Sequence, residues 1–345
     1  MSGEETIGVI GAGAWGTALA AVAARGGHAV RLWAREPEVA AAINEQRENP
    51  LFLPNVPLPA GMYAGTDFAI LRECTVILVV TPAQFMRAVL TTAIDSLEAD
   101  VPLVLCAKGI ERGSGKLMSM VAAEVAPGRP LAVLSGPTFA HEVAQGLPAA
   151  VTIASDEPTL ANRLAHLLGQ PNFRPYTSSD VIGAQIGGAV KNVIAIACGV
   201  VDGLGLGQNA RAALIARGLK EMIRFGRSRG ARMETMVGLS GAGDLVLTCT
   251  STASRNMSLG RALGEGRRLE EILAERRSVA EGVWTAEILA RLADEDGIEM
   301  PITQAVHALV GRGEAVGDVV DRLLSRPFTS EEEEDRIDAF SRDCP

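Results

Sequence analysis

A lysine lies in the middle of an apolar, small-residue stretch of this chain, where a charge is expensive to bury. The stretch IGGAVKNVIAIA, residues 186–197, contains Lys191 and Asn192 among glycine, alanine and β-branched residues. Lysines are seldom buried without a partner, because an isolated ammonium group loses its hydration. Two interpretations follow: Lys191 extends from a helix face to water, or it lies in a cleft and transfers protons. In a cleft, burial or a neighbouring cation would lower its pKa.

A glycine-rich turn near the start of the chain predicts a dinucleotide site. Gly11, Gly13 and Gly16 form the pattern G-x-G-x-x-G after an apolar run at 6–10, and a second such run begins about 20 residues later. The first glycine permits the tight turn, the second lets a pyrophosphate approach the backbone, and the third allows close helix packing. Free N–H groups at the helix start favour phosphates. The alternative is a glycine-rich turn without a ligand, which this strand–helix context disfavours.

The end of the second predicted strand bears on which nicotinamide cofactor binds. An acidic residue there binds a ribose 2′-hydroxyl, whereas an arginine accommodates a 2′-phosphate. This chain has Ala34 followed by Arg35, which favours NADP without excluding NAD. Glu36 comes one residue late for the acidic position and weakens that preference. An ordinary exposed charge at Arg35 remains the alternative.

Polar residues in four further stretches form a second candidate site. Each has a structural explanation when taken singly: Asp244 and Ser254 suit helix caps, and Lys108 and Arg255 suit the surface. Together they supply two lysines, a carboxylate and a polar group around an arginine, which suits a small anionic carbonyl compound. The stretches are LCAKGIE, LSGPTFAHEVAQG, GLSGAGDLVLTCTSTASRN and SVAEGVW.

The elements that must position these residues change character along the chain. Apolar strands alternate with helical patterns up to about residue 180, which predicts a doubly wound, Rossmann-type α/β sheet. Helical patterns alone follow. We therefore expect a dinucleotide-binding domain over 1–181, an all-helical substrate domain over 182–330, and a solvated or disordered acidic tail over 331–345. Lys191 then falls at a domain junction, where ligand sites are common. The predicted strands are 6–10, 29–33, 74–80, 101–106, 130–135 and 150–155, and the predicted helices are 14–26, 83–97, 115–126, 157–168, 182–201, 209–229, 254–263, 281–295, 302–311 and 317–324.

Composition excludes several classes of function. The net charge is −9 and no basic tract is present, which argues against a nucleic-acid partner. Five cysteines form no C-x-x-C pair and no basic signal segment opens the chain, which predicts a reducing, cytoplasmic setting. The four histidines lack metal-ligand spacing, so no metal is expected. The stretch 182–201 approaches the length of a membrane span. A lysine at the centre of such a span would cost roughly 2.5–3.5 kcal/mol. A buried helix of a globular protein is therefore favoured, and no integral membrane contact is expected.

Several long stretches resemble the bacterial glycerol-3-phosphate dehydrogenase (NAD(P)+) family. They occur in the family's order over nearly the whole chain except the acidic tail, and the run 190–219 and GLSGAGDLVLTC are the most specific. The resemblance implies reversible reduction of dihydroxyacetone phosphate to sn-glycerol 3-phosphate with NADP or NAD, which supplies bacterial phospholipid synthesis. The stretches are GAGAWGTALA, LWARE, FLPNVPLP, CAKGIE, SGPTFAHEVAQGLP, VKNVIAIACGVVDGLGLGQNARAALIARGL, GLSGAGDLVLTCTSTASRN and VAEGVWTA.

The resemblance and the polar residue types together assign roles to individual positions. Lys191 is the expected catalytic residue. Thr138 stands where relatives commonly have serine and keeps the hydroxyl, whereas Ala14 replaces a frequent serine and keeps only the backbone N–H. The expected substrate-binding residues are Lys108, Gly136, Thr138, Lys191, Asn192, Asp244, Thr248, Ser254, Arg255 and Asn256. The expected cofactor-binding residues are Gly11, Gly13, Ala14, Trp15, Gly16, Arg35, Lys108, Ala140, Arg255, Val279 and Glu281.

The expected mechanism is hydride delivery to the ketone carbon, with Lys191 donating the proton to the carbonyl oxygen. Lys108 would lower the pKa of Lys191, Asp244 would hold its ammonium group, and Ser254, Arg255 and Asn256 would bind the phosphate. We expect Gly187, Gly188 and Ala189 to let their helix lie close to the sheet domain, so that Lys191 points into the cleft. The exposed helical domain makes a homodimer the expected assembly. Alternatives are a related 3-hydroxyacid or ketopantoate-type dehydrogenase and a non-catalytic nucleotide-binding redox sensor.

Overall fold

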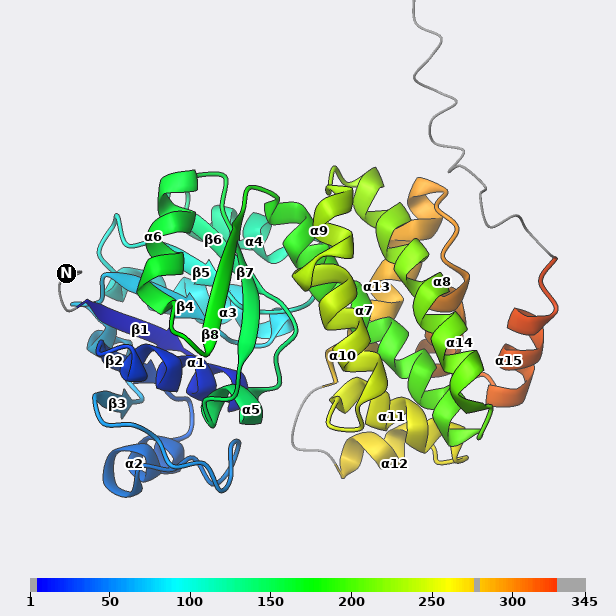
Figure 1. Ribbon diagram of the computed structural model, residues 1–345, viewed down its shortest axis with the longest axis horizontal. Helices are drawn as coiled ribbons and strands as arrows, with labels where there is room; N and C mark the ends of the chain where they lie inside the picture. The colour runs from blue at the N-terminus through cyan, green and yellow to red at the C-terminus, as the bar shows by residue number, and fades with distance from the viewer. Residues whose placement is uncertain (1–4, 276–279, 328–345) are drawn as a thin grey trace, which may run out of the picture.

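The structure is a computed structural model that describes residues 5–275 and 280–327 (Figure 1). A sheet with flanking helices occupies the left of Figure 1, and helices from residue 181 onwards occupy the right. The expected tail over 331–345 lies outside the described residues.

The described strands form a single sheet in the order β3-β2-β1-β4-β5-β6-β7-β8. Neighbours from β3 through β6 all pair in parallel. This is the doubly wound order, in which growth of the sheet reverses between β1 and β4, and ligands bind beyond the carboxyl ends of strands at such a point. The predicted fold class is confirmed. The strands are β1 Thr6–Ile10, β2 Ala29–Trp33, β3 Met62–Gly65, β4 Val76–Val79, β5 Leu103–Leu105, β6 Leu131–Ser135, β7 Ala149–Ala154 and β8 Phe173–Ser178.

Two strands and one strand direction differ from the prediction. The sheet edges β3 and β8 were not predicted, because edge strands are short and partly solvated: Tyr63 and Tyr176 are about half exposed, and β8 contains Pro175. β7 runs antiparallel to β6. The connection between them holds only the short helix α5, Ala140–Ala144, instead of the long crossover that a parallel pair needs.

Alternating side chains place the sheet between two apolar layers. Ile7 and Val9 of β1 belong to one buried cluster, whereas Ile10 belongs to the cluster on the opposite face. The strand period of two produces this alternation. The first layer includes residues of α1 and α6, and the second includes residues of α3 and α4. The flanking helices are α1 Ala14–Arg25, α2 Pro37–Gln46, α3 Ala83–Ala93, α4 Met118–Val125 and α6 Pro158–Leu168, with short 3₁₀ turns η1 Phe68–Leu71 and η2 Ile94–Ser96.

The chain beyond residue 180 contains helices only in its described part, as expected. The six predicted helices are present within a few residues, but the short segments α9, η3, α10 and α12 were not predicted. The glycines of SGAGD indicated a loop, and the structure instead forms a π-helical turn there. The elements are α7 Val181–Gly203, α8 Gly207–Ser228, α9 Met233–Val237, η3 Leu239–Gly243, α10 Asp244–Thr250, α11 Arg255–Gly264, α12 Leu269–Ala274, α13 Glu281–Asp296, α14 Pro301–Arg312 and α15 Val316–Leu324.

Helix α7 is the core of the helical part. Among the described helices it alone is long and apolar enough to cross a membrane. However, 89% of its apolar 18-residue stretch is buried inside the protein. It crosses α11 at backbone contact distance: a Cβ on Gly260 would lie 2.0 Å from the Ile196 carbonyl oxygen, and one on Gly199 2.1 Å from that of Met257. Only glycine allows so close a crossing. The four-residue spacing of Gly199 with Gly203 and of Gly260 with Gly264 is the sequence signal of this crossing.

Candidate active site

Lys191 lies on α7 with its ammonium group bound inside the protein. Its side chain is only 7% exposed, and Nζ lies 2.5 Å from Asp244 Oδ1 and 2.9 Å from Thr248 Oγ1. Asp244 and Thr248 are one turn apart on α10, so one helix face supplies both partners. The interpretation in which Lys191 extends to water is therefore wrong, because its charge is paired within the fold.

Lys108 brings a second ammonium group to the same carboxylate. It follows β5, and its Nζ donates to Asp244 Oδ2 at 2.7 Å and to the Gly136 carbonyl oxygen at 2.9 Å. Asp244 is fully buried and holds one lysine on each oxygen. The predicted pairing of Asp244 with the Lys191 ammonium and the predicted proximity of Lys108 are both seen in this geometry. One carboxylate facing two lysines leaves the cluster with a net positive charge.

The environment of Lys191 depresses its pKa. Burial disfavours the ammonium form and lowers the pKa of Lys191 to about 8, and Lys108 acts in the same direction. The Asp244 carboxylate opposes this shift, because it favours the charged form. The lysine therefore exchanges its proton within the range in which general acids and bases work.

Small residues on α7 decide how closely its neighbours approach. A Cβ on Gly188 would lie 3.0 Å from Ser135 Oγ and 3.3 Å from Lys108 Cγ, so Gly188 faces the sheet as expected. The expectation for Gly187 is wrong: its Cβ would lie 2.3 Å from the Ser240 carbonyl oxygen, which belongs to the helical part. Ala189 is packed in the core of the helical part. Gly187 therefore admits η3, which leads directly into Asp244.

The glycine-rich turn has an open face. Gly11 has φ +113°, which favours glycine, and a Cβ on Gly16 would lie 1.8 Å from the Gly11 carbonyl oxygen. A Cβ on Gly13 would meet nothing within 4 Å. The first and third glycines are thus required by the fold, and the second leaves space for a ligand at the start of α1.

A chain of contacts connects the glycine-rich turn to Lys108. Gly11 packs against Val80 at the end of β4, where its Cβ would lie 3.0 Å from the carbonyl oxygen. Ala83 opens α3 just beyond, and a Cβ on Gly109 would lie 2.7 Å from Ala83 Cβ. Gly109 adjoins Lys108. The turn and the lysines therefore lie along the same carboxyl edge of β1, β4 and β5, where a doubly wound sheet binds ligands.

Family models match both parts of the chain. The model for the NAD-dependent glycerol-3-phosphate dehydrogenase N-terminus matches residues 6–161, and the model for the C-terminus matches residues 180–321. The chain belongs to the NAD-dependent glycerol-3-phosphate dehydrogenase family. The resemblance inferred from its motifs is thereby confirmed, and the comparisons do not support the alternative dehydrogenase or sensor.

Curated relatives and a crystal structure match over nearly the full chain. A glycerol-3-phosphate dehydrogenase [NAD(P)+] of Rhodospirillum rubrum is 59% identical over 94% of this chain and 93% of its own length. One of Sphingopyxis alaskensis is 55% identical over 96% and 99%. The crystal structure of glycerol-3-phosphate dehydrogenase from Coxiella burnetii has a TM-score of 0.90 at 41% identity and covers 94% of this chain and 99% of its own.

Three further expected substrate residues of this family member, Ser254, Arg255 and Asn256, lie at the start of α11. Ser254 caps the helix, as its residue type suggested, since its Oγ accepts from the Met257 N–H at 3.2 Å. Asn256 donates to Asn192 Oδ1 at 2.9 Å and accepts from the Gly282 N–H at 3.0 Å. Both side chains are buried, whereas Arg255 is exposed between them. The amides tie α7, α11 and α13 together and leave Arg255 at the surface of the cluster.

The loop after β6 supplies Gly136 and Thr138. Gly136 has φ +149°, and a Cβ there would lie 3.0 Å from Val151 Cα, so glycine is needed where β7 passes. Its carbonyl oxygen receives Lys108 and also the Thr138 hydroxyl, at 3.3 Å. Ala140 opens α5 two residues later and is half-buried.

The expected cofactor residues differ in how firmly they are held. Arg35 is exposed, and both its Nε and Nη2 donate to Glu36 Oε1, at 2.9 and 2.6 Å. Trp15 Nε1 is buried and lacks a hydrogen-bond partner in the described part of the chain. Ala14 begins α1, and Val279 lies outside the described residues. The Arg35–Glu36 pair supports the expectation that Glu36 weakens the preference for a 2′-phosphate.

Glu281 connects the helical part to the cofactor edge of the sheet. Its Oε1 accepts from the Ala83 N–H at 3.2 Å, so this carboxylate of α13 occupies the start of α3. Its Oε2 is buried and lacks a partner among the described residues. Burial raises the pKa of Glu281, and the Ala83 N–H and Arg255 oppose that rise. An unpartnered carboxylate oxygen can accept from a ligand hydroxyl or amide.

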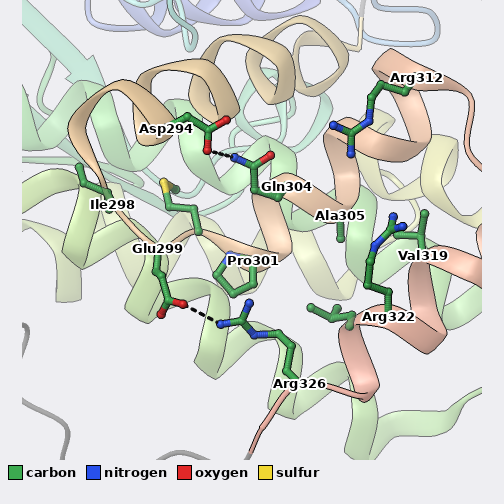
Figure 2. A pocket seen from close by; sticks show the side chains of 12 residues that line it. Asp294, Ile298, Glu299, Pro301, Gln304, Ala305, Arg312, Val319, Arg322 and Arg326 are labelled. Carbon is green, nitrogen blue, oxygen red and sulfur yellow. Dashed lines mark hydrogen bonds and ion pairs between the residues drawn. The ribbon is translucent and has the colours of Figure 1, made fainter.

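A separate hollow on the helical part lies away from these residues. It has a volume of about 310 Å³, and Figure 2 shows its lining by the end of α13, the start of α14 and α15. Arg326 pairs with Glu299, and Gln304 with Asp294. Arg312 and Arg322 both pair with Glu314. Each charged side chain that lines the hollow therefore has a hydrogen-bond or ion-pair partner among the described residues.

The described residues contain no cluster of three or more histidine, cysteine or carboxylate side chains that could hold a metal ion. Four cysteines, Cys74, Cys106, Cys198 and Cys249, are buried and unbridged.

Sequence reasoning missed Asn49, which is fully buried against the glycine-rich turn. It lies in a loop 37 residues beyond Ala12, and only the fold brings the two together.

Proposed function

We propose that this chain catalyses the reversible, NAD(P)H-dependent reduction of dihydroxyacetone phosphate to sn-glycerol 3-phosphate. Membership of the NAD-dependent glycerol-3-phosphate dehydrogenase family supports the reaction class. The observation that carries the proposal is the buried Lys191–Asp244–Lys108 cluster at the same sheet edge as an open glycine-rich turn.

The residues of the glycine-rich turn suit a dinucleotide. The space beside Gly13 admits a pyrophosphate, the N–H groups at the start of α1 are oriented to bind it, and Glu281 Oε2 has no other partner among the described residues. We assign cofactor contacts to the remaining expected residues, including Trp15, Arg35, Ala140 and Val279. A bound NADPH or NADH supplies the hydride. Arg35 paired with Glu36 favours a site that accepts both cofactors.

Lys191 acts on the proton. In reduction it donates from Nζ to the carbonyl oxygen, and in oxidation it accepts the hydroxyl proton. Asp244 and Thr248 hold Nζ in place and limit its rotation. The second cation, Lys108, adds positive charge beside an oxygen on which negative charge develops, and this interaction is strong where water is excluded.

Arg255 and its neighbours are proposed to bind the phosphate. A planar guanidinium group matches phosphate oxygens. Arg255 is exposed, whereas its neighbours Ser254 and Asn256 are buried. Asn192 and Asn256 also hold the starts of α11 and α13 against α7, and Thr138 and Gly136 border the substrate. We further propose a cytoplasmic homodimer that supplies phospholipid synthesis, with a dinucleotide domain over 1–181 and a substrate domain over 182–330.

Initial rates test the function directly. We expect oxidation of NADPH and of NADH that depends on dihydroxyacetone phosphate, with little turnover of small ketones that carry a carboxylate instead of a phosphate. Lys191→Ala should lose about 10²-fold or more in kcat while still binding the reduced cofactor, because it removes the general acid. Turnover within a few-fold of the unaltered protein would remove Lys191 from the mechanism, and faster turnover of a ketoacid would reject the substrate.

A further inference from the structure

We propose that Asn49 is a positioning residue for the cofactor. It sets the orientation of the Ala12–Gly13 peptide, so that the Gly13 N–H points into the space where a pyrophosphate binds. This inference rests on the proposed function, because it requires a dinucleotide at the glycine-rich turn.

Every polar atom of the Asn49 side chain has a partner. Nδ2 donates to the Ala12 carbonyl oxygen at 2.9 Å and to Thr17 Oγ1 at 2.8 Å. Oδ1 accepts from the Phe52 N–H at 3.1 Å. Thr17 Oγ1 in turn donates to the same Ala12 carbonyl oxygen at 3.2 Å. Asn49 and Thr17 are both fully buried, so this triangle is shielded from water.

The triangle controls one peptide plane. The described chain contains no cis peptide bond, and in a planar trans peptide the C=O and the following N–H point in opposite directions. Two donors hold the Ala12 carbonyl oxygen towards Asn49, so the Gly13 N–H points away from Asn49. Space is open beside Gly13, since a Cβ on this residue would meet nothing within 4 Å. Without the donors this peptide plane is held less firmly, because φ of Gly13, one of the two dihedral angles that turn it, is little restricted.

The segment that carries Asn49 is anchored independently of the cofactor. Arg47 ends α2 in the left-handed conformation with φ 57°, and its carbonyl oxygen accepts from the Leu58 N–H at 2.8 Å. The Leu53 N–H donates to the Asn49 carbonyl oxygen at 2.9 Å. Leu53, Val56 and Leu58 are buried in the sheet-side core. A rigid support of this kind can orient the turn before the cofactor arrives, which reduces the entropy lost on binding.

The test measures cofactor binding directly, by quenching of tryptophan fluorescence and by calorimetry. Asn49→Ala should raise the Kd of NADPH and of NADH by about tenfold each, because the pyrophosphate is common to both and the Ala12 carbonyl oxygen loses the shorter of its two hydrogen bonds. Thr17→Val removes the second donor to the Ala12 carbonyl oxygen and one acceptor of Asn49 Nδ2, but it leaves the bond from Asn49 to Ala12, so it should raise both Kd values by a smaller factor. The KM for dihydroxyacetone phosphate should stay within about twofold.

Asn44 offers a matched control. Its side chain also bridges two backbone groups, with Nδ2 donating to the Ala64 carbonyl oxygen and Oδ1 accepting from the Ala64 N–H, both at 2.8 Å. Asn44→Ala should lower the melting temperature without changing either Kd. Adenosine 2′-monophosphate, which lacks the pyrophosphate, should inhibit Asn49→Ala as well as it inhibits the unaltered protein.

The outcomes separate this inference from the function itself. Unchanged Kd values in both Asn49→Ala and Thr17→Val, or an equal rise in Asn44→Ala, would overturn the role of Asn49 while leaving the enzyme assignment intact. Weaker inhibition by adenosine 2′-monophosphate would also overturn it, because the effect would then lie away from the pyrophosphate. If Asn49→Ala does not fold, Asn49→Ser, which keeps one donor, and Thr17→Val decide the question. An unaltered protein that binds neither cofactor would refute both proposals.

Discussion

Two ammonium groups share one carboxylate at the candidate active site, and this imbalance of charge affects the pKa of Lys191. Asp244 holds Lys191 on one oxygen and Lys108 on the other. Burial outweighs the attraction of the carboxylate, which is why the pKa of Lys191 falls and not rises. A bound phosphate ester would compensate the second positive charge, so substrate and the lysine pair stabilise one another.

The pH dependence of turnover reports on Lys191. With its pKa near 8, kcat/KM for ketone reduction should be level below about pH 8 and fall above it, because reduction needs the ammonium form. Oxidation needs the neutral amine, so its kcat/KM should rise through the same range. Rate profiles in both directions with the unaltered protein check this.

Asp244→Asn provides the control for that profile. The carboxylate raises the pKa of Lys191, so its removal should move both limbs of the profile to lower pH as well as slow the reaction. Limbs that stay in place in the variant would show that a different group titrates.

At the scale of elements, a buried carboxylate fastens α14 to α8. Glu221 on α8 accepts from the Ile302 and Thr303 N–H groups, at 2.5 and 3.0 Å, and from Thr303 Oγ1 at 2.9 Å. These are donors of the first turn of α14, which begins at Pro301 and lacks a side-chain cap of its own. Burial raises the pKa of Glu221 to about 7, although these hydrogen bonds oppose the rise.

The Glu221 carboxyl group should make stability depend on pH. Its folded pKa of about 7 lies above the ordinary value of 4.5, so the folded protein binds more protons between these values. The free energy of unfolding should therefore fall as pH rises from about 4.5 to 7. Denaturant unfolding gives the free energy of unfolding of the unaltered protein and of Glu221→Gln at about pH 5 and about pH 8. The difference in this free energy between the two proteins should change by about 3 kcal/mol from one pH to the other. A difference that does not change with pH would contradict the raised pKa.

At the scale of the whole molecule, the candidate site exists because α7 lies against the sheet. Lys108 comes from the sheet part, whereas Lys191 and Asp244 come from the helical part, and Gly188 sets the distance between them. A side chain there meets the aliphatic part of Lys108 and Ser135 Oγ, which has no hydrogen-bond partner among the described residues.

Substitution at Gly188 should separate activity from stability. Gly188→Ala should be tolerated with a small loss, since its Cβ would lie 3.0 Å from a flexible hydroxyl. Gly188→Val should displace the Lys108 side chain and lower kcat/KM by about tenfold or more, since small misplacements of charged groups cost catalysis heavily. Steady-state kinetics and melting temperatures of the two variants check this, and normal kcat/KM in a folded Gly188→Val would refute the role of the contact between Gly188 and Lys108.

The local pattern of residues determined most of the sheet and helical elements, because strand and helix periods and turn glycines act over a few residues. It also marked Lys191, because a lone charge in an apolar stretch conflicts with burial. Edge strands β3 and β8, the reversed β7 and the π-helical turn before Asp244 depended on partners far along the chain. So did the side of α7 that Gly187 faces and the support that Asn49 gives to Ala12. Only the tertiary structure decided these, because a contact between distant residues leaves no periodic or short-range signal in the order of amino acids.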